Sequence, residues 1–333
     1  MSGFERYRAV VVAAALVTRS RRVAPATEGN ESKVAAQSPI SEMQRRTIGL
    51  GGSTAAAVLW SFGGIFVTLA YAPGLVLAFY RLIVGALAWA VVIYATRRRL
   101  TWALLRATWL GGVLLAGDMA MFYSAVKTTS IVDVTVIGAF QPALVMLVSR
   151  RLFDERLARR DVALILLAVA GVAMTVAGPG MSNHREVMGD ALAAGSMVIF
   201  SAYWMVSKRA RELCGALEYT SGVTLVAAVA MVPVVLVSGQ SLGQFRGSDA
   251  WWIVLLVAVP GSGHAVMNWA HRYVDASISS AISCLSPLAA ALLAIPILGQ
   301  TLSSSQLVGL AVGLVAIAAI AVRQRRPLAT PLE

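Results

Sequence analysis

Two ionisable side chains, Arg81 and Asp118, lie inside long apolar stretches of the sequence. A charged group inside a bilayer is costly, so it commonly marks a substrate or proton pathway. Each residue lies about eight positions from the outer end of its apolar stretch, and at a rise of about 1.5 Å per residue both reach similar depths. Their similar depth allows the two side chains to pair across neighbouring helices. They either line a substrate path in which Asp118 takes up a proton, or form a buried ion pair that joins two helices.

A second polar group consists of His264, Asn268 and His271, which follow i, i+4, i+7 spacing. Residues at this spacing share one face of a helix. Histidine titrates near neutral pH, so this face is a candidate proton relay. Hydrogen bonding between helices is the alternative interpretation.

Four further side chains are candidates for a binding site, and Gln141 is the strongest of them. Gln141 precedes Pro142, which lacks a backbone N–H and frees a carbonyl for another donor. Such a break at mid-depth is typical of a transporter site, although a packing kink is an equal alternative. Asp133 shares this face, either at the mouth of a pathway or as a solvated helix end. Trp60 and Tyr203 either stack on a substrate or pack in the core.

The composition places these residues in a membrane protein. The chain is 58% hydrophobic and only 13% charged, whereas a soluble domain averages about 25% charged residues. Residues 276–322 contain no Asp, Glu, Lys or Arg, and this run of 47 residues is long enough for about two bilayer crossings. The net charge of +12 comes from short Lys and Arg clusters between apolar runs, which argues against nucleic-acid binding.

The apolar runs predict ten transmembrane helices, each helical because an isolated strand in lipid would leave its backbone unpaired. The predicted spans are 49–70, 73–95, 104–126, 129–149, 161–178, 189–207, 218–238, 250–272, 276–298 and 304–322. With the N-terminus inside, the inner segments carry 24 Lys and Arg residues and the outer segments carry 3. Positive residues favour the cytoplasmic side, so we expect a multi-pass protein of the cytoplasmic membrane with both termini cytoplasmic.

The two ends of the chain differ from the rest. Residues 1–48 are polar and basic and predict a disordered cytoplasmic tail, and residues 323–333 form a second cytoplasmic tail. The apolar stretch within the first tail is too short to span, and the residues after it fit a signal-peptide cleavage site poorly. Met43 would make a normal start just before the first span, which suggests that the natural chain begins there.

The spans divide into two halves, 49–178 and 188–322, of five helices each. A shift of 145 residues superimposes Pro142 on Pro287 with matching spacing around them. Five is an odd number, so the second half enters the membrane in the opposite sense. The sequence therefore predicts an all-α integral membrane protein of ten transmembrane helices in two inverted five-helix repeats. This architecture is typical of secondary transporters, with the binding site between the halves.

Motifs for other chemistry are absent from the sequence. It has no HExxH or CxxC pattern and no P-loop, so we expect no metal, no cofactor and no ATP hydrolysis. The two cysteines do not suggest a disulfide framework. Gly309 and Gly313 form a GxxxG pattern, which admits a homodimer contact or packing within the bundle.

Four segments carry a resemblance to a known family. They are Leu59 to Gly63, Leu77 to Arg81, Phe122 to Ala125 leading to Pro142 and then Asp154 to Leu157, and Ser286 with Pro287 leading to Leu298 to Leu302. Together they make residues 49–322 resemble the drug/metabolite transporter superfamily, in the branch with two EamA-type repeats. Gln300 stands where this family usually has Glu. The resemblance implies a transporter, often an exporter of amino acids or related metabolites.

The expected function is a secondary active transporter that exports a small metabolite, such as an amino acid, by alternating access. Its partners would be a small-molecule substrate and the lipid bilayer. A multidrug or organic-cation exporter of the same fold is one alternative, and a non-transporting membrane partner subunit is another. An intramembrane enzyme would need clustered nucleophile, base or metal-ligand residues, and the dispersed histidines argue against that class.

Overall fold

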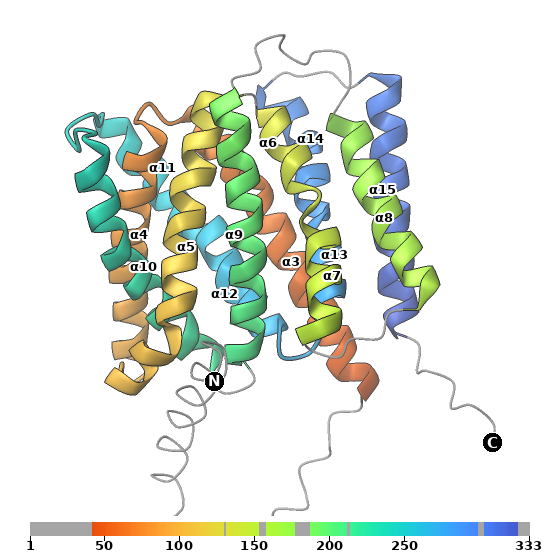
Figure 1. The fold of residues 1–333 in the computed structure, drawn as a ribbon, viewed down its shortest axis with the longest axis horizontal. Coiled ribbons are helices and arrows are strands. Elements are labelled where there is room, and N and C mark those ends of the chain that lie inside the picture. Colours follow the sequence, from red (N-terminus) through yellow and green to blue (C-terminus); the bar gives the residue numbers. More distant parts are fainter. Residues whose placement is uncertain are drawn as a thin grey trace, which may run out of the picture.

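The structure, a computed structural model, describes residues 42–129, 131–152, 158–176, 187–211, 214–298 and 303–325. Most of the predicted N-terminal tail and the position Gln300 lie outside these ranges. Within them, every regular element is a helix (Figure 1). The helices of the first half are α3 (Glu42–Leu69), α4 (Gly74–Ala95), α5 (Trp102–Thr128), α6 (Ile131–Gly138), α7 (Gln141–Leu152) and α8 (Arg159–Val176). Those of the second half are α9 (Val187–Arg211), α10 (Ala216–Ser238), α11 (Gly247–Ala258), α12 (Pro260–Ala270), α13 (Ala276–Ser283), α14 (Leu285–Leu298) and α15 (Ser304–Arg325).

Six helical segments of the described chain are long and apolar enough to cross a membrane. They are Met43–Leu69, Gly74–Ala95, Trp102–Thr128, Val187–Arg211, Ala216–Ser238 and Gly247–Ala270, the last of which joins α11 and α12. The other helices do not meet both conditions over their described residues. The all-helical membrane architecture is thus confirmed, while the number of spans stays a prediction.

Three of the predicted spans are broken near a proline. Proline lacks a backbone N–H, and its ring clashes with the carbonyl four residues earlier. Accordingly α6 ends at Gly138, four residues before Pro142, and α13 ends at Ser283, four residues before Pro287. The break between α11 and α12 falls at Pro260, which opens α12. The kink expected at Pro142 is therefore one of three such interruptions.

The helices pack as neighbours that lie far apart in the sequence. α8 lies along α15, α5 lies along α9 and α10, and α3 lies along α12 (Figure 1). α3 begins and α15 ends at the same end of the bundle, the lower end in Figure 1. Burial of apolar side chains produces one core around α4, α5 and α10 and another around α8, α13 and α15. The space between these two cores holds the candidate site.

The GxxxG glycines of α15, Gly309 and Gly313, contact α8 inside the bundle. A Cβ atom on Gly171 of α8 would lie 2.5 Å from the backbone nitrogen of Gly313 and 2.9 Å from the carbonyl oxygen of Gly309. Small residues permit this close approach of two helix backbones. The packing interpretation of the pattern therefore accounts for these glycines, and a homodimer contact stays an untested prediction.

Substitution of Gly171 by valine is expected to push α8 away from α15. Overpacking a tight helix contact costs about 1–3 kcal/mol, so the purified protein should unfold at a lower temperature. Gly51→Val is the matched control, because a Cβ on Gly51 meets nothing within 4 Å. Thermal unfolding in detergent measures both variants. Equal midpoints for the two would contradict this account of the contact.

Candidate functional site

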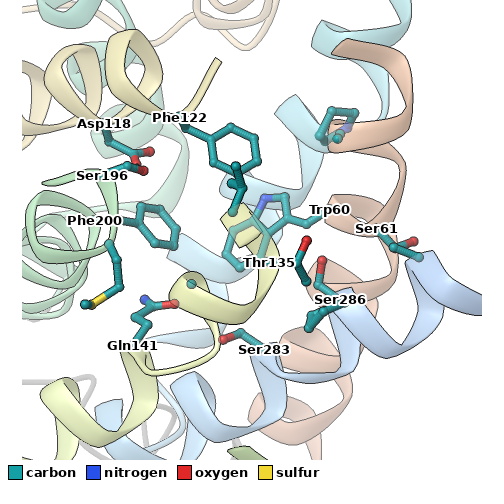
Figure 2. Close-up of a pocket in the computed structure, with 18 of the residues that line it drawn as sticks. Trp60, Ser61, Asp118, Phe122, Thr135, Gln141, Ser196, Phe200, Ser283 and Ser286 are labelled. Atoms are coloured by element: carbon teal, nitrogen blue, oxygen red, sulfur yellow. The ribbon is translucent and has the colours of Figure 1, made fainter. Parts of the chain in front are cut away.

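A cavity of about 240 Å³ lies between the two halves of the bundle (Figure 2). Helices α3, α4, α5, α6 and α7 line it from the first half, and α9, α12, α13 and α14 line it from the second. All three proline-broken spans reach it, at Pro142, Pro260 and Pro287. Broken helices at mid-depth expose backbone polar groups where a solute can use them.

Asp118 supplies the negative charge of the cavity. The side chain is 4% exposed, and its Oδ1 accepts a hydrogen bond of 2.6 Å from the Ser196 hydroxyl. Figure 2 shows the two side chains together on one side of the pocket, with Phe122 and Phe200 next to them. Because α5 packs along α9, the carboxylate meets a donor from the other half of the chain. This contact crosses the boundary between the halves.

Arg81 supplies the positive charge, and the direct ion pair with Asp118, one of the two interpretations given above, is not formed in the described part of the chain. Both residues line the cavity, yet the described residues include no salt bridge or hydrogen bond to the Arg81 guanidinium, whose Nε is buried without a partner. The reason is that the two side chains point in different directions. Ser196 occupies the carboxylate, whereas the guanidinium lies towards α12, with Nη2 3.9 Å from the position of a Cβ on Gly261. Similar depth in the membrane does not fix the direction of a side chain.

Three more predicted site residues line the same cavity. Trp60, Gln141 and His264 each carry a buried nitrogen without a hydrogen-bond partner, namely Nε1, Nε2 and Nδ1. The Trp60 ring centroid lies 5.1 Å from that of His264 and 5.8 Å from that of Phe200. These side chains form an apolar and aromatic wall with donors embedded in it.

The remaining candidates lie elsewhere. Asn268 donates to the Tyr203 hydroxyl at 3.3 Å and to Thr220 at 3.2 Å, outside the cavity lining. His271 packs against Trp204, with ring centroids 4.9 Å apart. Only His264 of the histidine stripe reaches the cavity, and the described side chains of the stripe do not form a continuous hydrogen-bonded chain. Hydrogen bonding between helices accounts for Asn268.

The last candidate, Asp133, belongs to α6, but its side chain is outside the described part of the chain.

The site also includes residues that were not predicted from the sequence. Ser196 and Phe200 have i, i+4 spacing on α9, and Asp118 and Phe122 have the same spacing on α5. This repeated i, i+4 pairing of a polar and an aromatic residue is the sequence feature that could have predicted these side chains as part of the site.

The bundle is closed at the end where α3 begins. There the hydroxyls of Ser149 on α7 and Ser277 on α13 are 2.5 Å apart and fully buried. The basic end of α9 adds two further links. Lys208 Nζ donates to the Val274 carbonyl at 2.6 Å, and Arg209 Nη1 donates to the Leu152 carbonyl at 3.1 Å. The contacts of Ser149 with Ser277 and of Arg209 with Leu152 join the two halves at this end, whereas Lys208 and Val274 both belong to the second half.

Comparisons with known proteins agree with the fold and the two halves. The EamA-like transporter family matches residues 47–177 and again residues 187–322. No curated protein matches the chain. A solved structure titled "Crystal structure of protein" is 23% identical, covers 83% of this chain and 97% of its own, and has a TM-score of 0.70, a likeness that shows the fold alone. The predicted resemblance is confirmed: the chain belongs to the EamA-like transporter family of the drug/metabolite transporter superfamily, whose members are membrane transporters.

Proposed function

We propose that this membrane transporter is a secondary active exporter that moves a small metabolite, such as an amino acid or a related compound, across the cytoplasmic membrane by alternating access. The observation that carries the proposal is the cavity between the two family repeats. It holds Arg81 and Asp118 and is bordered by three broken helices. In this proposal Asp118 binds and releases the proton that drives transport.

The packing of the helices supports an inverted repeat of five spans. If α6 with α7, α11 with α12, and α13 with α14 each make one span, every half has five spans. The first helix of each half then packs on the third span of the other half, as α3 does on α12 and α9 on α5. The second and fifth spans pack on their own counterparts, α4 on α10 and α8 on α15. A twofold axis relating the halves would produce this pattern.

The conformation fits an outward-facing carrier with cytoplasmic termini. At the end where the described chain starts and finishes, α7 packs on α13. Towards the opposite end, α6 and α14 both border the cavity, through Thr135 and Ala290 among others. Alternating access would separate α7 from α13 and bring α6 and α14 together.

The proposed topology predicts how introduced cysteines react in intact cells. Gln240→Cys, in the exposed segment after α10, should react with a membrane-impermeant maleimide, whereas Arg99→Cys, in the exposed segment after α4, should react only after lysis. The native thiols give little background, because Cys284 is buried and burial raises the pKa of Cys214 to about 11. Labelling of Arg99→Cys in intact cells would contradict cytoplasmic termini.

Filling the cavity is expected to stop transport. Ala290→Trp adds a large ring to a lining position, whereas Leu292→Trp adds the same ring to a position on the same helix that is 42% exposed. Cells expressing each variant would be preloaded with a labelled panel of amino acids and organic cations. We expect selective efflux from the wild type and from Leu292→Trp, and none from Ala290→Trp at equal membrane abundance. Equal efflux from both variants would exclude this cavity as the pathway.

An organic-cation exporter is the second candidate function. The Asp118 carboxylate lies in a cavity walled by Trp60, Phe122 and Phe200. Aromatic faces attract cations by roughly 0.5–2 kcal/mol, depending on desolvation. The same efflux panel separates the candidates, because it contains both compound classes. A well-inserted protein that exports no compound would favour a non-transporting partner subunit.

A further inference from the structure

Three hydrogen-bond donors without partners belong to side chains that line the cavity. Trp60 Nε1, Arg81 Nε and Gln141 Nε2 are buried and make no hydrogen bond, and each can only donate in that form. A buried polar group without a partner is destabilising, so such groups in a native protein call for an explanation. A ligand that brings acceptor atoms into the cavity would satisfy them.

The charge of Arg81 makes the requirement stronger. Its side chain is only 5% exposed, and breaking or omitting the partner of a buried charge is costly. The Asp118 carboxylate is hydrogen-bonded to Ser196 and forms no ion pair with Arg81. Asp118 attracts the guanidinium across the cavity without contacting it, so the donor positions of Arg81 remain open to the anionic group of a ligand.

Arg81 and Trp60 lie next to the start of α12. This helix of 11 residues begins at Pro260, which lines the cavity together with Trp60, Arg81 and His264. Trp60 Nε1 lies 2.9 Å from the position of a Cβ on Gly263, in the first turn of the helix. A helix N-terminus carries a partial positive charge and favours anions. Three features of positive or donor character, namely Arg81, Trp60 Nε1 and the start of α12, thus meet at one place.

We propose that the transported solute carries a carboxylate that binds to Arg81 at the start of α12, with Trp60 as a second donor. Arginine suits this role because its planar guanidinium donates two parallel hydrogen bonds to a carboxylate. The rest of the solute packs against Phe122 and Phe200, which line the same cavity, with the Phe200 ring centroid 5.8 Å from that of Trp60 (Figure 2). The inference rests on the proposed function and specifies how that site recognises its substrate: organic anions and zwitterions bind, whereas amines without a carboxylate do not use this subsite.

Binding to the purified full chain in detergent tests the proposal with four probes of similar size. They are 3-phenylpropionate, phenylalanine, the neutral 3-phenylpropanamide and the cationic 2-phenylethylamine. We expect at least one of the two carboxylates to bind about tenfold or more tighter than the amide and the amine, as a charge-assisted hydrogen bond implies. Binding of 3-phenylpropionate but not phenylalanine would restrict the class to simple organic acids, and the reverse would restrict it to zwitterions.

Variants of Arg81 separate recognition from folding. Arg81→Gln should lose about tenfold or more of the carboxylate affinity and lower the affinity for the neutral amide much less, because the amide makes no charge-assisted hydrogen bond. Arg81→Lys, which keeps the charge and loses the two-pronged geometry, should fall between the two. Arg106→Gln removes an exposed charge from α5 and should bind like the wild type. The intermediate affinity of Arg81→Lys tests the subsite even if Arg81→Gln fails to fold.

Three results would overturn the inference: tighter binding of the amine, carboxylate affinity that is unchanged in both Arg81 variants, or no binding of any probe. Uptake of the same probes into proteoliposomes distinguishes this failure from failure of the proposed function. Uptake of the amine alone would support transport by this protein and contradict the proposed anion subsite. Arg81-dependent binding without any uptake would support the subsite and contradict the proposed transport function.

Discussion

Asp118→Asn is expected to abolish transport driven by a pH gradient. Asparagine keeps the size of the side chain and can still accept the hydrogen bond from Ser196, but it cannot bind and release a proton near neutral pH. Efflux of the substrate from energised cells or vesicles should therefore fall to the background of cells without the protein. Release of the substrate driven only by its own gradient should be affected less.

Asp190→Asn is the matched control for this experiment. Asp190 accepts a hydrogen bond of 2.9 Å from Thr129 at the other side of the same α5–α9 contact, but it does not line the cavity. The variant should transport like the wild type. If Asp118→Asn still responded to the pH gradient, Asp118 would not be the coupling group. If the transport rates of both variants did not depend on the pH gradient, the substrate gradient would be the source of energy.

Joining α7 to α13 by a disulfide is expected to stop transport reversibly. Ser149 and Ser277 are fully buried with their hydroxyls in direct contact at the closed end of the bundle. Cysteines at both positions would place two sulfur atoms close enough to bond, as a disulfide requires. Alternating access requires α7 and α13 to separate once in every cycle, so the oxidised Ser149→Cys, Ser277→Cys protein should be inactive and should recover on reduction.

The cross-link needs a background without the native thiols, in which Cys214 and Cys284 are replaced by alanine. Each single-cysteine variant is then a control that oxidation should not inactivate. Mass spectrometry measures the fraction of chains that carry the disulfide. A fully cross-linked protein that transports at the rate of its reduced form would exclude movement of α7 against α13 from the mechanism.

The sequence was sufficient to predict the helices, because lipid leaves little choice to a long apolar segment. The main differences lie at helix ends. The sixth predicted span ended at residue 207, whereas α9 continues to Arg211. The predicted span ends at residue 207 because the next residues, Lys208 and Arg209, are basic. Here Lys208 and Arg209 remain helical, and their side chains donate to the carbonyls of Val274, between α12 and α13, and of Leu152 in α7.

The helix breaks were only partly predictable. The proline at position 142 suggested an interruption, and the same reasoning applied to Pro260 and Pro287 would have suggested the other two. Proline also occurs inside α10, at Pro233, without ending that helix. A proline therefore permits a break, and the packing around it decides whether the helix continues. That packing was not accessible from one sequence.

The residues of the candidate site were predicted more accurately than the contacts between them. Arg81, Asp118, Gln141 and His264 were selected by polarity within apolar runs, and all four line one cavity. The direct pairing of Asp118 with Arg81 is not formed among the described residues, and it could not be judged from the sequence, because a position along a helix gives depth but not the direction in which a helix faces its neighbours. The donor to Asp118 comes from α9, whose packing against α5 depends on the whole fold.

The measurement that tests the central claim most directly is counterflow with the purified protein in proteoliposomes. Vesicles would be loaded with a high concentration of a solute identified in the efflux panel and diluted into a trace of the same labelled solute, without any ion gradient. An alternating-access carrier exchanges one molecule for another, so the account predicts transient accumulation of label above its external concentration. Ala290→Trp vesicles should show none. Equilibration without accumulation in wild-type vesicles would contradict the account and indicate a channel or a leak.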